Sequence, residues 1–380
     1  MCHVKYWFEN IFMKYYIIAG EASGDLHGSN LMKAIKELDT QATFRCWGGD
    51  LIQGQMDTPL VKHYKDIAFM GFVEVVKNLP TIFKGLRFCK KDILEYEPDV
   101  LLLIDYPGFN LRIAEFAKAK GIKVFYYIAP QVWAWRSSRV KKIKRIVDHL
   151  FVILPFEKAF FKKWEMDVDY VGHPLLDAIE KDNLLLEKQS SNDEKPIIAL
   201  LPGSRQQEVK RILPIMLEAV EQLPDYQFVI AGTSALSIDF YQSLIQDQNV
   251  GVRINETYDL LRQAKAALVT SGTATLETAL FKVPQVVCYK GNWISYHIGR
   301  RLINVKYISL VNLILEEAVV EELIQDDCTA ENMANGLKKL FQNPSFLQNK
   351  YQILAEQLGQ GGASNRTAQL VMKYLSKDKS

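Results

Sequence analysis

The chain has 380 residues, of which 48% are hydrophobic and 24% are charged, and its formal net charge is +2. This composition is close to that of an average globular protein and argues against disordered, coiled-coil and collagen-like chains. At about 100–200 residues per domain, the length predicts two domains. The nearly neutral charge predicts no general affinity for nucleic acid.

The five cysteines are scattered and never form a CxxC pair, so the sequence predicts neither a disulfide framework nor a zinc site. This usage fits a reducing cytosol. Residues 1–12 are apolar and aromatic but lack the features of a signal peptide, and we interpret them as an extension before a start at Met13. No apolar run approaches the roughly 20 residues that span a bilayer, so we expect any membrane contact to be peripheral.

Short β-rich apolar runs alternate with helical patterns along the chain, which is typical of βαβ units and a parallel sheet. The first series of predicted strands covers residues 15–19, 42–47, 100–104, 123–128, 149–154 and 168–171. A polar stretch at residues 181–196 predicts a linker or an edge loop. A second series covers residues 197–201, 227–231, 250–254, 266–269 and 285–288, and helical segments are expected from about residue 318 onward.

These patterns predict an α/β fold with two doubly wound domains in tandem. The expected N-terminal domain covers residues 13–175, the C-terminal domain covers residues 195–345, and C-terminal helices cover residues 346–380. Ligands of such sheets bind beyond the carboxyl ends of the strands. We therefore expect the active site in a cleft between the two domains.

The stretch GEASGDLHG follows the first predicted strand. Its glycines are four residues apart, which is not the GxGxxG spacing of a dinucleotide-binding site, so an NAD site is disfavoured. We predict a strand-turn-helix whose glycines permit close backbone approach. Ser23 or Asp25 is expected to cap the helix, and Glu21 to point into the cleft. A tight turn with capping residues alone explains the stretch equally well.

Asp105 lies in the stretch LLLIDYPGFN, directly after a predicted strand of aliphatic residues. This is the end of the strand where ligands bind. Asp105 is either the cap of a helix beginning near Asn110 or a catalytic base. Because Pro107 and Gly108 predict a turn before the helix, we favour the catalytic role.

Two strand-to-helix junctions in the second half of the chain can hold an anion. In LPGSRQQEVKRILP, Ser204 and Arg205 can donate hydrogen bonds to anionic oxygens. A bare cation is unfavourable at a helix start, which favours a bound anion there. In VTSGTATLETALF, Ser271, Gly272 and Thr273 leave a helix start open to a phosphate.

Glu277 lies about one helical turn beyond the second of these junctions. Its carboxylate can accept hydrogen bonds from both hydroxyls of a ribose. An ordinary acidic residue in the first turn of a helix fits the same pattern, and the sequence leaves both interpretations open.

The stretch PQVWAWRSSRVKKIKRI joins two tryptophans to six basic residues. Such a stretch suits nucleic acid or an anionic lipid surface, although a charge run is most often a solvated helix face. His173, in VGHPLLDAI, is expected to be a structural or hinge residue because no second His or Cys lies at metal-ligand spacing.

A helix expected from Pro80 carries the predicted membrane contact. Its core-facing residues recur at helical spacing and are Ile82, Leu86, Cys89 and Ile93. Phe88 lies on the opposite face among the bases Lys84, Arg87 and Lys91. An aromatic residue among bases is typical of a helix that lies on anionic lipid. The alternative is that Phe88 packs under a neighbouring loop and the bases are solvated.

Several stretches together resemble one family. They are IAGEASGDLHG, IDYPGFN, APQVWAWRSSRVKKI, VGHPLLD, LPGSR and TSGTATLETAL, and they resemble the lipid-A-disaccharide synthase family of the bacterial lipopolysaccharide pathway. The resemblance spans Met13 to the C-terminal helices, and GEASGD combined with VWAWR is its most specific part. It implies a GT-B glycosyltransferase with two Rossmann-like domains, the first binding a lipid acceptor and the second a UDP-sugar.

The resemblance also implies a reaction. The family joins UDP-2,3-diacylglucosamine to 2,3-diacylglucosamine 1-phosphate, giving UDP and the β-1,6-linked lipid A disaccharide 1-phosphate. An α-linked donor that gives a β product means inversion, which needs a base and a stabilised leaving group. No metal or other cofactor is implied.

The same resemblance implies residue roles. Asp105 would take the proton of the acceptor's 6-hydroxyl, on a catalytic side shared with Glu21, Ser23 and Asp25. The donor side would stabilise the departing UDP with Ser204, Arg205, Ser271, Gly272, Thr273, Glu277 and Asn312. Apart from the resemblance, the residue patterns described above predict an acceptor or membrane side with Arg87, Phe88, Trp133 and Arg136.

These implications predict a cytoplasmic protein, peripheral on the inner face of the inner membrane and with no nucleic-acid partner. Whether it forms a homodimer is left open. Two alternatives remain. One is another GT-B enzyme, such as a lipid-linked N-acetylglucosaminyl transferase or a UDP-sugar 2-epimerase. The other is a non-catalytic module that binds a nucleotide sugar or RNA.

Overall fold

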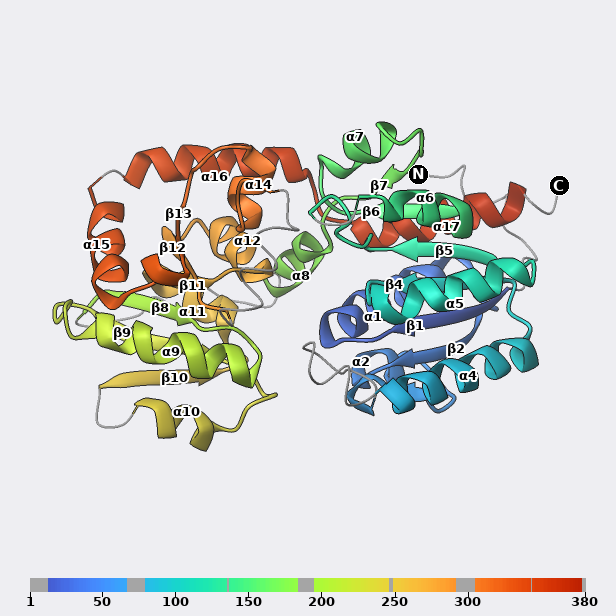
Figure 1. The fold of residues 1–380 in the computed structure, drawn as a ribbon, viewed down its shortest axis with the longest axis horizontal. Helices are drawn as coiled ribbons and strands as arrows, with labels where there is room; N and C mark the ends of the chain where they lie inside the picture. The colour runs from blue at the N-terminus through green and yellow to red at the C-terminus, as the bar shows by residue number, and fades with distance from the viewer. Residues whose placement is uncertain are drawn as a thin grey trace. The chain divides into compact units, whose positions relative to one another are not determined.

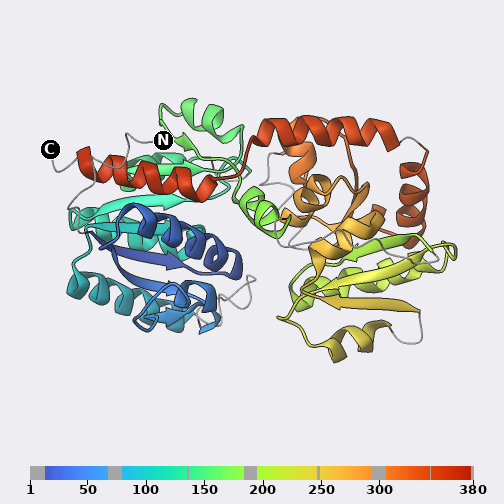
Figure 2. The ribbon, with the colours of Figure 1, turned by 180° about the vertical axis from the view of Figure 1, so that it is seen from behind.

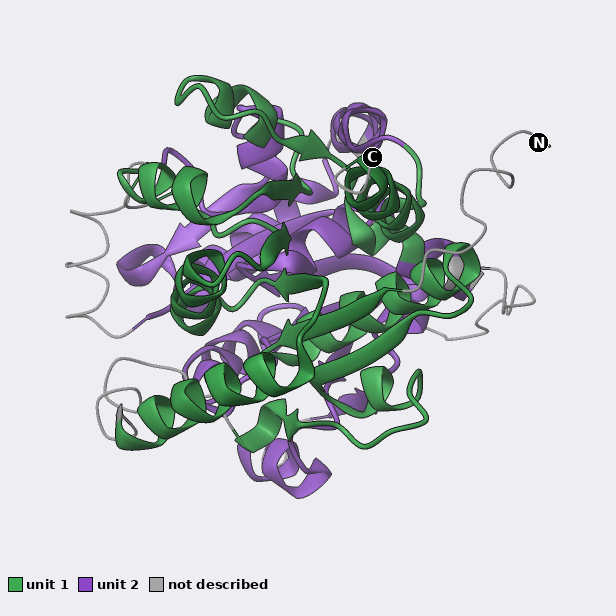
Figure 3. Cartoon of the chain, turned by 90° about the vertical axis from the view of Figure 1, so that its right-hand side faces the viewer, with its two compact units in different colours: residues 1–177, 360–380 green, residues 178–359 purple. Residues whose placement is uncertain are grey.

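The computed structural model describes residues 13–66, 79–134, 137–183, 195–245, 249–291, 305–342 and 344–377. The chain divides into two compact units, residues 1–177 with 360–380 and residues 178–359 (Figure 3). Each unit is built on one parallel sheet with helices on both faces (Figure 1). The predicted α/β fold with two doubly wound sheets is therefore confirmed.

The sheet of the first unit has seven strands in the order β3-β2-β1-β4-β5-β6-β7. Their bounds are β1 Lys14–Ala19, β2 Thr43–Gly48, β3 Lys62–His63, β4 Val100–Ile104, β5 Lys123–Tyr127, β6 His149–Val152 and β7 Asp169–Tyr170. The strand order reverses between β1 and β4, and their last residues, Ala19 and Ile104, are paired in register. The loops after two such strands diverge, and this divergence makes the carboxyl edge a ligand-binding position.

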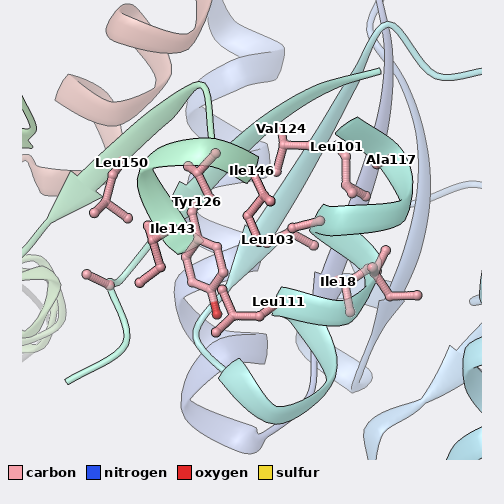
Figure 4. Packing of buried hydrophobic residues seen from close by; sticks show 14 of the residues in the cluster. Ile18, Leu101, Leu103, Leu111, Ala117, Val124, Tyr126, Ile143, Ile146 and Leu150 are labelled. Atoms are coloured by element: carbon pink, nitrogen blue, oxygen red, sulfur yellow. The ribbon is translucent and has the colours of Figure 1, made fainter. Parts of the chain in front are cut away.

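Hydrophobic layers cover both faces of this sheet. One layer is formed by α4 (Leu79–Tyr96), α5 (Pro107–Ala119), α6 (Arg139–Ile146) and α7 (Glu157–Lys162). Figure 4 shows the part of this layer that α5 and α6 contribute. The other is formed by α1 (Ala22–Leu38), α2 (Asp50–Gln53) and α17 (Ala363–Lys377), and α17 lies beside α1 (Figure 2). Side chains alternate across a strand, so the neighbours Tyr126 and Tyr127 of β5 belong to opposite layers.

The sheet of the second unit has six strands in the order β10-β9-β8-β11-β12-β13. Their bounds are β8 Ile197–Leu201, β9 Gln227–Gly232, β10 Val250–Ile254, β11 Ala264–Thr270, β12 Gln285–Tyr289 and β13 Glu321–Ile324. One face packs on α9 (Gln206–Val220), α10 (Ile238–Ile245) and α15 (Ala330–Leu340), and the other is bordered by α11 (Thr257–Gln263) and α12 (Thr273–Leu280). The order reverses again, here between β8 and β11.

Each predicted strand is present, with ends within two residues of expectation, but two further strands were not predicted. The expectation of helix from residue 318 onward is wrong for Glu321–Ile324, which is β13 and pairs in parallel with β12. The apolar spacing of Val319, Val320 and Leu323 fits a helix as well as a strand. Pairing with the free edge of β12 makes this segment a strand rather than a helix. Because β12 is distant in sequence, the local pattern does not reveal this pairing.

The C-terminal helices are shared between the units. α14 (Leu310–Leu315) and α16 (Pro344–Leu358) belong to the second unit, whereas α17 belongs to the first. The carboxylate of Asp177, in α8 (Pro174–Asn183), accepts the amide N–H groups at the start of α17, from Gly362, Ala363 and Ser364. This carboxylate caps α17 and ties the end of the chain to the first unit.

The predicted linker at residues 181–196 lies mostly outside the described residues, as do residues 1–12 and the apolar stretch before α4. Within the described parts of the chain, no helix has both the length and the apolarity to cross a membrane.

Candidate functional site

Two predicted motifs meet at the carboxyl edge of the first sheet. GEASGD follows β1 and DYPGFN follows β4, and these strands are neighbours at the point where the strand order reverses. A Cβ atom placed on Gly20 would lie 2.2 Å from the ring of Tyr106. Only glycine therefore allows the two turns to approach so closely, with the Tyr106 ring over the backbone of the first.

The backbone at Asp105 and Tyr106 is left-handed, with φ angles of 45° and 49°. This conformation costs non-glycine residues roughly 1–2 kcal/mol each, and such outliers cluster at functional sites. The Asp105 amide donates to the carbonyl of Tyr127 at 3.1 Å. Its carbonyl accepts from Asn110 Nδ2 at 2.7 Å and from the Tyr126 hydroxyl at 2.5 Å. At about 0.5–1.5 kcal/mol net per bond, the contacts offset a strain of similar size.

The helix after Asp105 begins earlier than predicted. α5 starts at Pro107 rather than near Asn110, and proline is favoured at a first helical position because its φ angle suits the helix. The expected turn at Pro107 and Gly108 is therefore wrong. The cap position of α5 is Tyr106, whose side chain makes no capping hydrogen bond.

The carboxyl group of Asp105 is half-buried. Burial raises the pKa of the Asp105 carboxyl above its ordinary value, and a hydrogen bond from the Tyr106 amide opposes this shift. A carboxylate whose pKa lies nearer neutrality is a better proton acceptor than an exposed one.

The polar residues of the GEASGD motif have different surroundings. Glu21 is half-buried at the cap position of α1, and Ser23 is exposed in the first turn. Burial and the negative charge of Glu21 raise the pKa of Tyr106 to about 12.

Asp25 is buried, and its carboxylate accepts three amide N–H groups, from Gly49 at 2.7 Å and from Leu51 and Ile52 at 3.0 Å. The predicted capping of α1 by Ser23 or Asp25 is wrong because both lie inside that helix. Asp25 instead holds the start of α2, a long-range contact that the local pattern does not reveal.

Replacing Asp25 with alanine should lower the free energy of unfolding by about 3 kcal/mol or more, because buried amides are left without an acceptor. Urea unfolding followed by circular dichroism measures this change. Ser23→Ala, at an exposed position of the same helix, should change stability by less than about 0.5 kcal/mol. Equal stability of the two variants would exclude the supporting role of Asp25.

In the second unit, Arg205 occupies the cap position of α9, and Ser204 precedes it, both exposed. The Arg205 guanidinium contacts Glu208 in the first turn of α9 at 3.0 Å. The cation is therefore balanced within the chain, so its placement alone does not require a bound anion. A phosphate would have to compete with the Glu208 carboxylate.

The second junction leads into α12. Gly272 and Thr273 are exposed at its start, and the cap position is Gly272, which has no side chain that could cap the helix. The Ser271 hydroxyl donates to the carbonyl of Ile308 at 2.9 Å, so it holds a neighbouring loop. The amides at the helix start remain the groups suited to an anion.

Glu277 and Asn312 are both tied into the second unit. Glu277 accepts a hydrogen bond from the Tyr258 hydroxyl at 3.3 Å, and burial raises the pKa of its carboxyl. The buried amide of Asn312 donates to the Val320 carbonyl and the Glu322 carboxylate and accepts the amides of Val319 and Val320. These four hydrogen bonds use the full capacity of the Asn312 amide. The Asn312 side chain therefore holds the backbone of Val319 and Val320, directly before β13.

The helix α4 presents the face that was predicted. Its core residues Leu86, Cys89 and Ile93 are buried, and Phe88 is 49% exposed. The bases around Phe88 are also exposed, namely Lys84, Arg87 and Lys91. The Phe88 ring rests at 6.1 Å from the buried ring of Trp47, and Phe83, which the sequence pattern missed, is 54% exposed on the same helix.

The aromatic-basic stretch is partly paired within the chain. Trp133 is half-buried, and its indole N–H donates to Glu157 at 3.2 Å, while Arg136 lies outside the described residues. Lys142 and Arg145 of α6 both pair with Glu115 of α5. These pairs fit a solvated helix face.

His173 is buried, and its Nδ1 accepts the amide N–H of Leu175 at 3.2 Å. Burial lowers the pKa of His173 to about 3, so the ring is neutral. Both observations fit the predicted structural role. Among the described residues, no group of three or more His, Cys, Asp or Glu side chains is arranged to hold a metal ion.

Comparison with known proteins decides the family. Residues 15–374 match a family model described as lipid-A-disaccharide synthetase. The chain belongs to the lipid-A-disaccharide synthase family. Relatives named lipid-A-disaccharide synthase occur in Trichlorobacter lovleyi, with 39% identity over 94% of this chain and 97% of the relative, and in Syntrophus aciditrophicus, with 40% identity over 95% and 97%. The chain is therefore a glycosyltransferase of lipid A disaccharide formation, as its motifs predicted.

Solved structures share the fold. The UDP-GlcNAc 2-epimerase of Neisseria meningitidis, bound to UDP-GlcNAc, is similar with a TM-score of 0.66 and 14% identity over 95% of this chain and 100% of that one. The glycosyltransferase of kitacinnamycin is similar with a TM-score of 0.64 and 13% identity over 96% and 100%. At these identities the likeness concerns the fold alone, which is the GT-B arrangement of two Rossmann-like domains.

Proposed function

We propose that this glycosyltransferase joins UDP-2,3-diacylglucosamine to 2,3-diacylglucosamine 1-phosphate with inversion. The 6-oxygen of the acceptor forms a bond to the anomeric carbon of the donor, and the bond from that carbon to the UDP oxygen breaks. The acceptor proton passes to the carboxylate of Asp105. The position of Asp105 carries this proposal, because it lies at the edge of the first sheet where the strand order reverses, with a raised pKa.

Neighbouring residues support the reaction in different ways. Glu21 at the cap position of α1 and Ser23 in the first turn of α1 follow β1, the neighbour of the strand that precedes Asp105, and we assign them to the acceptor sugar. Asp25 has its oxygens occupied by backbone amides, so we assign it to positioning the turn rather than to chemistry.

The second unit would bind the donor. The amides of Gly272 and Thr273 at the start of α12, with Ser204 and Arg205 at the start of α9, would stabilise the diphosphate as UDP departs. Glu277 would accept the ribose hydroxyls. Ser271 and Asn312 would position the surrounding loops, because their polar groups are used within the chain.

Incubation with UDP-diacylglucosamine, with and without the monosaccharide lipid acceptor, tests the proposed reaction. We expect equal amounts of UDP and disaccharide, and neither product at a comparable rate without acceptor. Release of UDP that does not depend on the lipid would instead favour a UDP-sugar 2-epimerase. Salt-sensitive RNA binding without UDP release would favour a binding module.

Substitution of Arg205 by alanine should weaken UDP binding about 10-fold or more, because a charge-assisted hydrogen bond contributes roughly 1.5–3 kcal/mol. Isothermal titration calorimetry measures the dissociation constant. Glu208→Gln provides the matched control, since it removes the competing carboxylate and should leave UDP binding equal or tighter. An unchanged dissociation constant in Arg205→Ala would remove Arg205 from the donor site.

The exposed face of α4 would hold the protein on the cytoplasmic face of the inner membrane, where the lipid acceptor lies. Phe83 and Phe88 offer apolar side chains, and Lys84, Arg87 and Lys91 offer charge to anionic lipid. The acceptor carries two acyl chains and has to be reached from the bilayer, which supports a surface of this chemistry.

A further inference from the structure

Two buried side chains hold the backbone of Asp105, although neither takes part in the reaction as described. We propose that Tyr126 and Asn110 are positioning residues that fix the direction of the Asp105 carboxylate by clamping its backbone carbonyl. This inference rests on the proposed role of Asp105 as the base. It adds two residues, from β5 and α5, that set how well this base works.

The clamp consists of two donors on one oxygen. Asn110 Nδ2 lies 2.7 Å from the Asp105 carbonyl oxygen, and the Tyr126 hydroxyl lies 2.5 Å from it. Both donors are fully buried, with exposed fractions of 0%. Water therefore does not compete for these two hydrogen bonds. Together they hold the Asp105 backbone in one conformation.

The clamp replaces the backbone hydrogen bond that the Asp105 carbonyl would accept if the strand continued. The Asp105 amide continues the ladder by donating to Tyr127, one residue beyond the last pair of β4 and β5. The left-handed φ angles at Asp105 and Tyr106 then turn the next carbonyl out of the ladder. Side chains satisfy that carbonyl, so the turn depends on them for its shape.

The hydroxyl of Tyr126 is placed for this contact. Its ring lies among aliphatic side chains that include Leu111 of α5 and Ile143 of α6, which offer no partner for a hydroxyl group (Figure 4). Asn110 reaches back from the first turn of α5, and its Nδ2 also lies 3.2 Å from the Ile104 carbonyl. Two elements thus converge on the end of β4.

Release of the carbonyl should affect catalysis rather than binding. Without the clamp, Asp105 and Tyr106 can relax toward ordinary backbone angles, which turns the carboxylate and lifts the Tyr106 ring from Gly20. A misplacement of about 1 Å can reduce a rate by roughly 100-fold. The UDP site is proposed on the other unit and should be unaffected.

The test compares Tyr126→Phe with Tyr127→Phe. Both remove one buried phenol oxygen from β5, but the Tyr127 side chain belongs to the opposite layer, toward α17. We expect kcat of Tyr126→Phe to fall about 10- to 100-fold, with KM for both substrates within about 2-fold and unchanged UDP affinity by calorimetry. Tyr127→Phe should keep kcat within about 2-fold of the parent.

A double-mutant cycle separates positioning from loss of stability. In an Asp105→Asn background the base is already absent, so Tyr126→Phe should reduce the residual rate by less than about 2-fold. Asn110→Asp, which removes the amide donor at nearly constant volume, should resemble Tyr126→Phe. If Asn110→Asp does not fold, the tyrosine pair alone decides the outcome.

The outcomes distinguish this inference from the proposed function. Near-parental turnover of Asp105→Asn would contradict both the proposed role of Asp105 as the base and the proposed positioning role of Tyr126 and Asn110. A collapse of turnover in Asp105→Asn with parental kcat in Tyr126→Phe would overturn the clamp alone. Equal losses in both backgrounds, or in Tyr126→Phe and Tyr127→Phe, would show a structural effect without positioning.

Discussion

Asp105→Asn should reduce turnover about 10²–10⁴-fold, the usual contribution of a general base, while UDP affinity persists. Asparagine keeps the size of the side chain and can still accept a hydrogen bond from the Tyr106 amide, but it does not take up the acceptor proton. Disaccharide formation and UDP release measure the first effect, and calorimetry with UDP measures the second.

The pH dependence of turnover provides an independent test of Asp105 as the general base. Burial raises the pKa of the Asp105 carboxyl, so its ionised, basic form is complete only above that raised value and is lost as pH falls through it. The acidic limb of the kcat profile should lie above about 3.9, the ordinary value for aspartate. The limb should be absent from Asp105→Asn.

A control is available at the other end of the same strand. Asp99 precedes β4, and its carboxylate accepts the amide N–H of Lys14 at 2.8 Å. Asp99→Asn keeps an acceptor oxygen and should leave turnover close to that of the parent. Turnover of Asp105→Asn at the level of this control would exclude Asp105 as the base.

The sheets were predictable because most strands carry a strong local signal. β4 is buried along its whole length and reads as a continuous aliphatic run, as expected of a parallel strand. β3 has only the two residues Lys62 and His63, with no apolar pattern to detect. β13 carries a pattern that fits a helix equally well, and its pairing with β12 depends on tertiary contact.

The candidate site was predictable in position but not in conformation. The place of Asp105 after an apolar strand indicated a ligand-facing carboxylate. The left-handed backbone did not follow from the motif, because it is held by Tyr126, which lies 21 residues away in sequence. A local pattern cannot contain such a contact.

Asp25 and Asn312 also show that a local sequence pattern does not contain long-range contacts. For these two residues, the pattern suggested a binding role that the contacts do not support. Both are polar residues in motifs that resemble binding sites, and both are buried with their polar atoms used by distant backbone groups. Residue type indicates what a side chain can bind. Only the structure shows which partners it already has.

Replacing Arg87 with glutamate and Phe88 with serine should release the protein from anionic vesicles. A basic residue near an anionic bilayer contributes about 1 kcal/mol, so the charge reversal removes about 2 kcal/mol, or roughly 30-fold in affinity. Loss of the half-exposed Phe88 ring removes further apolar contact. We expect the total loss to approach 100-fold, measured by co-sedimentation with vesicles that contain phosphatidylglycerol.

A matched double variant in the second unit controls for charge and apolar surface. Phe346 of α16 is 42% exposed, with Lys350 at 5.7 Å from its ring. Phe346→Ser with Lys350→Glu changes the same residue classes and the same net charge, and it should still co-sediment with vesicles.

The α4 variant should also lose turnover on acceptor embedded in vesicles while keeping UDP binding, which shows that the second unit remains folded. The Phe88 ring rests on the buried Trp47, so thermal unfolding of the variant has to be compared with that of the parent. If the α4 variant co-sediments as well as the control, α4 is not the membrane contact. Loss of sedimentation in both variants would mean that total charge, and not this helix, holds the protein on the lipid surface.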